Sequence, residues 1–154
     1  MVEKKYRVFV YGTLMSGERN THKLVESTLI NGNAVTAEAS FLMEQFNSSS
    51  GGKGKFTPGV QKGGVNHIKG EIWEVDEKTL AILDELEGYD PSKPMKENKY
   101  LREKIKMQDG STALIYIINT NEKDPIPRPH NRIHYDATNN LQSWVREESK
   151  LDLY

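Results

Sequence analysis

Hydrophobic residues along this chain fall mainly into short runs and alternating stretches that are typical of β-strands. The first run, residues 6–11, is nearly continuous in β-branched and aromatic residues, which predicts a buried central strand. Five further segments contain the apolar pattern of a strand: 35–46, 58–60, 68–75, 100–107 and 112–118. The turn signal Asp109-Gly110 predicts that the last two form a hairpin.

One segment has the period of an α-helix. Asp76 has the character of an N-cap and Glu77 follows in the first turn, while Gly88 is a good left-handed terminator after Glu87. At about 100° per residue, an apolar stripe forms on one side of this helix. Its members are Leu80, Ile82, Leu83 and Leu86.

An acidic residue shares this apolar stripe. Helical geometry places Glu87 between Leu80 and Leu83, whereas Glu85 points away and Asp84 lies at the edge. Contact with apolar surface disfavours the charged carboxylate, so the pKa of Glu87 is expected to rise toward neutrality, as a general acid/base requires. The alternative is that Glu87, at the helix end, leans into solvent or binds a local cap.

The remaining segments carry weaker patterns. Residues 21–29 suit a short helix or a loop, and residues 140–150 suit a terminal helix with Leu141, Trp144 and Val145 on one stripe. By composition residues 47–55 form a loop, either a tolerated insertion or a functional lid. We therefore expect one barrel-like α+β domain over residues 1–154, with a tail from about residue 135.

Composition and charge exclude several classes of protein. Among 154 residues the formal net charge is −1, so no basic field favours nucleic acid or an anionic membrane. Cysteine is absent, which removes disulfides and thiolate chemistry. No signal-peptide pattern or membrane-length apolar run is present, so a cytoplasmic location is expected. The four histidines lack zinc-site spacing, and residues 51–55 lack the spacing of a phosphate loop; we expect no metal.

Several motifs in order carry a resemblance to a known family. They are Val8-Phe9-Val10-Tyr11-Gly12-Thr13-Leu14, Gly70-Glu71-Ile72-Trp73-Glu74-Val75, Leu83-Asp84-Glu85-Leu86-Glu87-Gly88 and Tyr100-Leu101-Arg102. This set resembles the gamma-glutamylcyclotransferase superfamily. With Gly17 and Asn20, the opening is similar to the gamma-glutamylamine cyclotransferase-like branch. The resemblance extends over residues 6–118 and implies a small mixed β-barrel flanked by helices, with one cavity at its mouth.

The resemblance also implies a reaction, which needs no cofactor. In this reaction the α-amine of a small gamma-glutamyl substrate attacks the substrate's own γ-carbonyl, which releases 5-oxoproline and an amine. Relatives differ in the leaving amine, so an amino acid, the ε-amine of lysine and another side-chain amine remain alternatives. The second functional class is a binding module that holds a small anionic metabolite in the same cavity. The oligomeric state is not predicted.

By resemblance, Glu87 would be the carboxylate that moves the protons. The loop Tyr11-Gly12-Thr13-Leu14 would bind the α-carboxylate and the oxyanion through its N–H groups. Tyr116 would face the cavity. The alternatives are that Tyr11 and Tyr116 are ordinary core tyrosines and that Thr13 only stabilises the turn. His130 stands where some relatives carry a substrate-contacting tyrosine.

Overall fold

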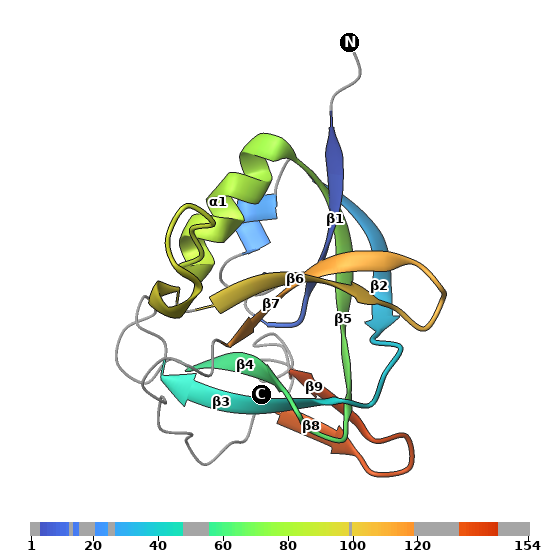
Figure 1. Cartoon of the computed structure of the whole chain (residues 1–154). Coiled ribbons are helices and arrows are strands. Elements are labelled where there is room, and N and C mark those ends of the chain that lie inside the picture. The colour runs from blue at the N-terminus through green and yellow to red at the C-terminus, as the bar shows by residue number, and fades with distance from the viewer. Residues whose placement is uncertain are drawn as a thin grey trace, which may run out of the picture.

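A computed structural model of the chain describes residues 4–12, 14–15, 21–24, 27–47, 56–98, 100–118 and 133–144. In this part of the chain a mixed β-sheet curls into a half-barrel, and one α-helix packs beside it (Figure 1). The elements are β1 (Lys5–Val10), η1 (Thr21–Leu24), β2 (Thr28–Val35), β3 (Phe41–Asn47), β4 (Phe56–Lys62), β5 (His67–Asp76), α1 (Glu77–Glu87), η2 (Met95–Glu97), β6 (Tyr100–Lys106), β7 (Thr112–Ile118), β8 (Ile133–Asp136) and β9 (Leu141–Trp144).

The long strand β5 organises the main sheet. It pairs antiparallel with β1 and β2 and parallel with β9, and the strand order is β6-β7-β1-β5-β9-β8. Strands β3 and β4 form a separate hairpin. The Ala37 N–H donates to the Lys106 carbonyl and the Gln108 N–H to the Val35 carbonyl, each at 2.9 Å. These bonds join the end of β2 to the end of β6, so the sheet curls back on itself.

The strongest sequence patterns correspond to the elements that position the site. The continuous apolar run forms β1, which lies between β5 and β7, and its residues Val8, Phe9 and Val10 are all buried. A strand covered on both faces needs such a run rather than an alternating one. The hairpin β6–β7 also forms as predicted, with Gly110 in its turn at φ 90°.

The prediction of a terminal helix over residues 140–150 is wrong for residues 141–144, the part that forms a regular element within the described chain. Leu141–Trp144 forms β9, which pairs with β5 and β8. Gln142 and Trp144 alternate as buried residues, and the Gln142 side-chain amide bonds both the N–H and the carbonyl of Met43 at 2.7 and 3.1 Å. One of the two buried strand positions, Gln142, is polar, so the alternation is not visible in the apolar pattern, and the apolar residues alone, spaced by three and four, indicated a helix.

Strand β2 was not expected. Residues 21–29 contain the short helix η1 and the start of β2, which continues to Val35. Its sequence, Thr-Leu-Ile-Asn-Gly-Asn-Ala-Val, lacks a clean alternation, and its register with β5 shifts twice. The strand conformation of these residues therefore depends on pairing with β5, because their local propensity does not favour a strand. Of the loop predicted over residues 47–55, Asn47 ends β3 and the rest lies outside the described residues, as does the proline-rich stretch 125–132.

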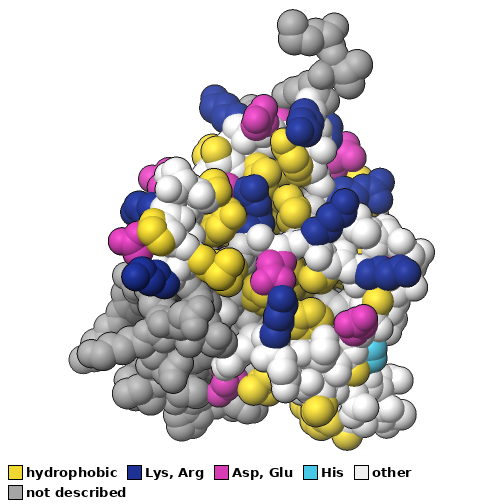
Figure 2. Space-filling model, viewed as in Figure 1, with side chains coloured by type: hydrophobic (Ala, Val, Ile, Leu, Met, Phe, Trp, Pro, Cys, Tyr) yellow, Lys and Arg dark blue, Asp and Glu magenta, His cyan; other side chains and the backbone are white. Residues whose placement is uncertain are grey.

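Charged groups of both signs are interspersed over the face shown in Figure 2, in keeping with the net charge of −1. No helix within the described ranges is long and apolar enough to cross a membrane.

Candidate active site

The C-terminal turn of α1 presents the candidate acid. The Asp76 carboxylate accepts the Thr79 N–H at 2.7 Å and caps the first turn, and Gly88 ends the helix at φ 69° and ψ 34°. Both boundaries match the prediction from sequence. Leu80 and Leu83 are buried, and Glu87, the last helical residue, is half-buried.

The remainder of the expected stripe is less uniform. Glu85 is exposed and Leu86 is half-buried, both consistent with the helical geometry. Ile82, which was expected on the buried stripe, is 38% exposed, so this assignment is wrong. The residue lies at the far edge of the stripe, where the sheet no longer covers the helix.

Glu87 faces three buried tyrosines from separate parts of the chain. Tyr11 follows β1, Tyr100 begins β6, and Tyr116 lies in β7. Burial is the largest cause that raises the pKa of each hydroxyl, and the negative charge of Glu87 raises all three pKa values further. The three hydroxyls are therefore protonated at neutral pH.

The Tyr11 hydroxyl is part of the barrel wall. It donates to the Tyr116 main-chain carbonyl at 2.7 Å, and its ring centre lies 6.2 Å from that of Phe9. A hydrogen bond with the Val60 backbone acts on the same hydroxyl and lowers its pKa slightly against the effect of burial. Tyr11 thus connects β7 with β4, two strands that are not paired in a sheet, so its hydroxyl is already engaged by the protein.

We expect Tyr11→Phe to lower the free energy of unfolding by about 1–3 kcal/mol, because the buried Tyr116 carbonyl loses its donor. Chemical denaturation of the variant and of wild type would measure this. Tyr6→Phe is a matched control, because Tyr6 is only half-buried in β1. An unchanged stability of Tyr11→Phe together with a raised KM would instead make this hydroxyl a substrate ligand.

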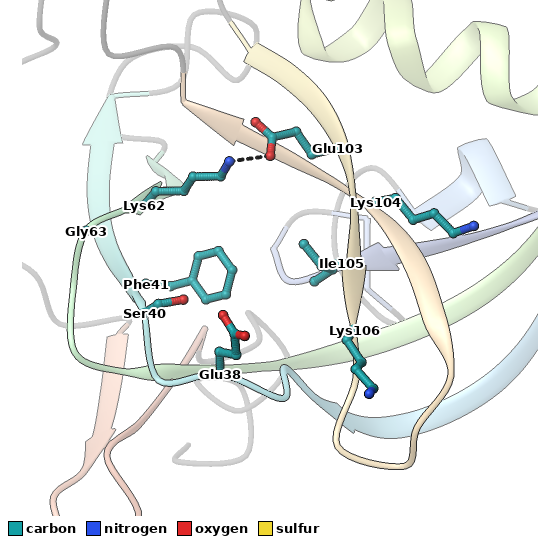
Figure 3. A pocket seen from close by; sticks show the side chains of 9 residues that line it. All are labelled: Glu38, Ser40, Phe41, Lys62, Gly63, Glu103, Lys104, Ile105 and Lys106. Atoms are coloured by element: carbon teal, nitrogen blue, oxygen red, sulfur yellow. Dashed lines mark ion pairs between the residues drawn. The ribbon is translucent and has the colours of Figure 1, made fainter.

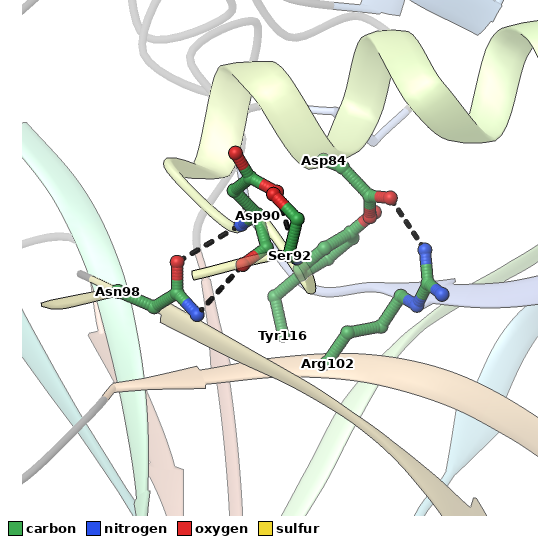
Figure 4. A network of polar contacts seen from close by, with 6 residues as sticks. All are labelled: Asp84, Asp90, Ser92, Asn98, Arg102 and Tyr116. Carbon is green, nitrogen blue, oxygen red and sulfur yellow. Dashed lines mark hydrogen bonds and ion pairs between the residues drawn. The ribbon is translucent and has the colours of Figure 1, made fainter. Parts of the chain in front are cut away.

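The Tyr116 side chain is also engaged. Its hydroxyl donates to Asp84 Oδ1 at 2.7 Å (Figure 4). The hydroxyl proton therefore bonds the helix, while the oxygen can still accept a hydrogen bond, and the prediction that Tyr116 binds substrate stays a prediction. Tyr100, which was not singled out as a site residue, is also buried, and the charge of Glu87 acts on its hydroxyl.

The predicted glycine loop follows β1 directly. Gly12 and Leu14 are buried, and the Met15 N–H donates to the Gly12 carbonyl at 3.0 Å, which closes a tight turn. Close approach is the reason for glycine at position 12, because an added Cβ would lie 2.4 Å from Pro58 Cγ in β4. Thr13 lies outside the described residues, so its predicted role stays a prediction.

The sequence analysis did not predict which groups bond to the C-terminal turn of α1. Asp84 accepts both from Tyr116 and from Arg102 Nη1, which lies 2.5 Å from Oδ2. The sequence contained a signal, since Asp84 precedes Glu87 by three residues and therefore lies on the neighbouring part of the same helix face.

A separate groove of about 460 Å³ lies between β6 and the β3–β4 hairpin (Figure 3). Phe41 and Ile105 line it, and an ion pair between Lys62 and Glu103 crosses its rim. None of the predicted site residues lines this groove. No group of three or more His, Cys, Asp or Glu side chains suited to a metal occurs within the described part of the chain.

The fold is shared with several solved structures. An AIG2-like protein from Mus musculus superposes with a TM-score of 0.57 at 24% identity, over 77% of this chain and 80% of that one. A gamma-glutamyl cyclotransferase superposes with a TM-score of 0.53 at 20% identity, over 82% of this chain and 73% of that one. These likenesses define an α+β fold of the gamma-glutamylcyclotransferase class.

The family follows from the sequence match. The family model described as gamma-glutamyl cyclotransferase, AIG2-like, matches residues 8–137, and the chain belongs to this family. It is 30% identical to gamma-glutamylaminecyclotransferase A of Danio rerio over 138 residues, covering 85% of this chain and 80% of that protein. A putative gamma-glutamylcyclotransferase of Drosophila melanogaster is 40% identical over 84 residues, 54% of this chain and about half (52%) of that protein.

Proposed function

We propose that this protein is a gamma-glutamylcyclotransferase that releases 5-oxoproline from a gamma-glutamyl amine or amino acid, with Glu87 as the general acid/base. Membership of the family supports the reaction class, and the relatives named above support the gamma-glutamyl substrate. The observation that carries the role of Glu87 is its position, half-buried at the end of α1, with its charge acting on three buried tyrosine hydroxyls.

The reaction needs proton transfer and no added reagent. The α-nitrogen forms a bond to the γ-carbon, and the bond from that carbon to the leaving nitrogen breaks. The α-ammonium group loses two protons as it becomes the lactam N–H, and the leaving nitrogen gains two as it departs as an ammonium group. One carboxylate that accepts and returns each proton in turn satisfies this balance, so Glu87 ends in the state in which it began.

The surroundings of Glu87 supply the remaining requirements. The N–H groups of the loop at residues 11–14 would hold the α-carboxylate and stabilise the oxyanion. Tyr100 has a buried hydroxyl on which the charge of Glu87 acts, and burial keeps it protonated, so it would be a tyrosine donor to a substrate bound at Glu87. A desolvated site of this kind strengthens both interactions.

The test is release of 5-oxoproline by the purified full-length chain, measured by liquid chromatography and mass spectrometry. The substrates would be gamma-glutamyl amides of α-amino acids, of the lysine ε-amine and of simple alkylamines. At least one is expected to yield equal amounts of 5-oxoproline and free amine. The same substrate with an acetylated α-amine is the matched control, because it cannot cyclise.

Two results would contradict the proposal. Release of glutamate in place of 5-oxoproline would mean hydrolysis by water. Calorimetric binding of these compounds without turnover would favour the binding module that holds a small anionic metabolite.

A further inference from the structure

The Asp84 carboxylate connects α1 to two strands at once. Its Oδ1 accepts from the Tyr116 hydroxyl at 2.7 Å, and its Oδ2 accepts from Arg102 Nη1 at 2.5 Å (Figure 4). The Asp84 side chain is only 14% exposed, so both bonds are largely shielded from water. The carboxylate thereby attaches one turn of the helix to both β6 and β7.

The same residue also closes the end of the helix through its main chain. The Asp84 carbonyl accepts the Tyr89 N–H at 2.9 Å, the bond that ends a helix in a left-handed glycine turn. The Arg102 guanidinium lies 5.2 Å from the centre of the Tyr89 ring, a favourable cation–π distance. Asp84, Tyr89 and Arg102 therefore form a closed ring of contacts, and Glu87 lies within the segment that this ring spans.

The chain beyond the helix is held in turn to the start of β6. Asp90 N–H donates to Asn98 Oδ1 at 2.9 Å, and Asn98 Nδ2 donates to the Asp90 carbonyl at 3.1 Å. Asn98 is 3% exposed, and Figure 4 shows its side chain bonded to Asp90. The segment that follows Glu87 is therefore bonded to the helix through Tyr89 and to Asn98, just before β6, through Asp90.

We propose that Asp84 is a positioning residue for Glu87: it holds the last turn of α1 against β6 and β7 and neutralises the charge of Arg102 at this end of the helix. This inference rests on the proposed function of Glu87 and specifies how that residue is kept in place. Asp84 contacts no reacting atom in this scheme.

The charges around Glu87 predict opposite effects for the two partners. The charge of Glu87 acts on Tyr11, Tyr100 and Tyr116. The ion pair of Asp84 with Arg102 lies at the same end of α1, where Asp84 also accepts from Tyr116. Asp84→Asn leaves the positive charge of Arg102 uncompensated and should lower the pKa of Glu87. Arg102→Gln leaves the negative charge of Asp84 uncompensated and should raise it.

The experiment compares Asp84→Asn, Arg102→Gln and the double variant with wild type. The pKa of Glu87 would be followed by carbon-13 NMR of its carboxyl group, assigned by its loss in Glu87→Gln. We expect shifts of opposite sign in the single variants and a value near that of wild type in the double variant. Glu85→Gln is the matched control, since Glu85 is exposed on the same helix, and it should leave the Glu87 pKa unchanged.

The second measurement is the steady-state kinetics of each variant on the substrate that wild type turns over fastest. Asp84→Asn should lower kcat roughly 10- to 100-fold, because small displacements of a catalytic group have effects of this size, while KM changes little. The acid limb of its pH–rate profile should move to lower pH, because Glu87 must start deprotonated. The limb of Arg102→Gln should move to higher pH.

Several outcomes would contradict this role of Asp84. Shifts of the same sign in both single variants would indicate general loosening of the helix end, and no shift would remove the role of Asp84. If Asp84→Asn does not fold, Arg102→Gln and Arg102→Lys replace it, and only the first should raise the Glu87 pKa. Because the NMR titration needs no turnover, an inactive wild type would refute the proposed function and leave this inference testable.

Discussion

Glu87→Gln is expected to abolish 5-oxoproline release, with a fall in kcat of at least about 10²- to 10⁴-fold. The amide has nearly the shape of the carboxylate, so packing at the end of α1 should be preserved. It cannot accept a proton from the α-ammonium group at neutral pH, and it has none of acidic character to return to the leaving amine. The measurement is kcat across the pH range for the substrate that wild type turns over fastest.

Two controls separate chemistry from folding in this variant. Glu85→Gln makes the same change two residues earlier on the exposed side of the helix and should keep full activity. Binding of the acetylated substrate, measured by calorimetry, should be similar in Glu87→Gln and wild type. Full activity of Glu87→Gln would exclude Glu87 as the acid/base, whatever reaction the protein catalyses.

The second large effect is expected from Gly12→Ala. The new Cβ would lie 2.4 Å from Pro58 Cγ and 2.8 Å from Pro58 Cδ, inside any allowed contact distance. The proline ring is rigid and belongs to β4, so the turn after β1 must move instead. We expect the free energy of unfolding to fall by about 1–3 kcal/mol, as in other overpacked sites. Activity should fall with it, because Tyr11 and the loop amides move.

Gly32→Ala is the matched control for this change. An added Cβ at Gly32 meets only Leu29 Cδ2, at an ordinary distance of 4.0 Å. Denaturant unfolding and the cyclotransferase assay should show a clear loss for Gly12→Ala and a much smaller change for Gly32→Ala. Equal stabilities in the two variants would mean that Pro58 yields easily, and that Gly12 is not required for close approach.

The parts of the fold that the sequence predicted are those specified by neighbouring residues. The cap at Asp76 and the terminator at Gly88 act within one turn of the helix, so both ends of α1 could be predicted. The hairpin β6–β7 follows from its own turn at Asp109-Gly110. In each case the signal lies in the element itself.

The errors concern strands whose partners are distant in the sequence. β2 lacks a clean alternation and pairs with β5 about forty residues away, while β9 pairs with β5 from the end of the described chain. At residues 141–144 the apolar spacing indicated a helix stripe and not a short strand, because one of the two buried strand positions, Gln142, is polar. Only the available hydrogen-bonding edge of β5 distinguishes them.

The candidate site likewise has a part that the sequence predicted and a part that only the tertiary structure decided. Helical periodicity placed Glu87 on the packed side of α1, since 100° per residue is a local property of the backbone. The charge of Glu87 acts on Tyr11, Tyr100 and Tyr116 because the curl of the sheet brings three separate segments to one helix end. Only the tertiary structure decides this arrangement. The bonds from Asp84 to β6 and β7 have the same origin, because hydrogen bonds between distant segments exist only once the sheet has closed around them.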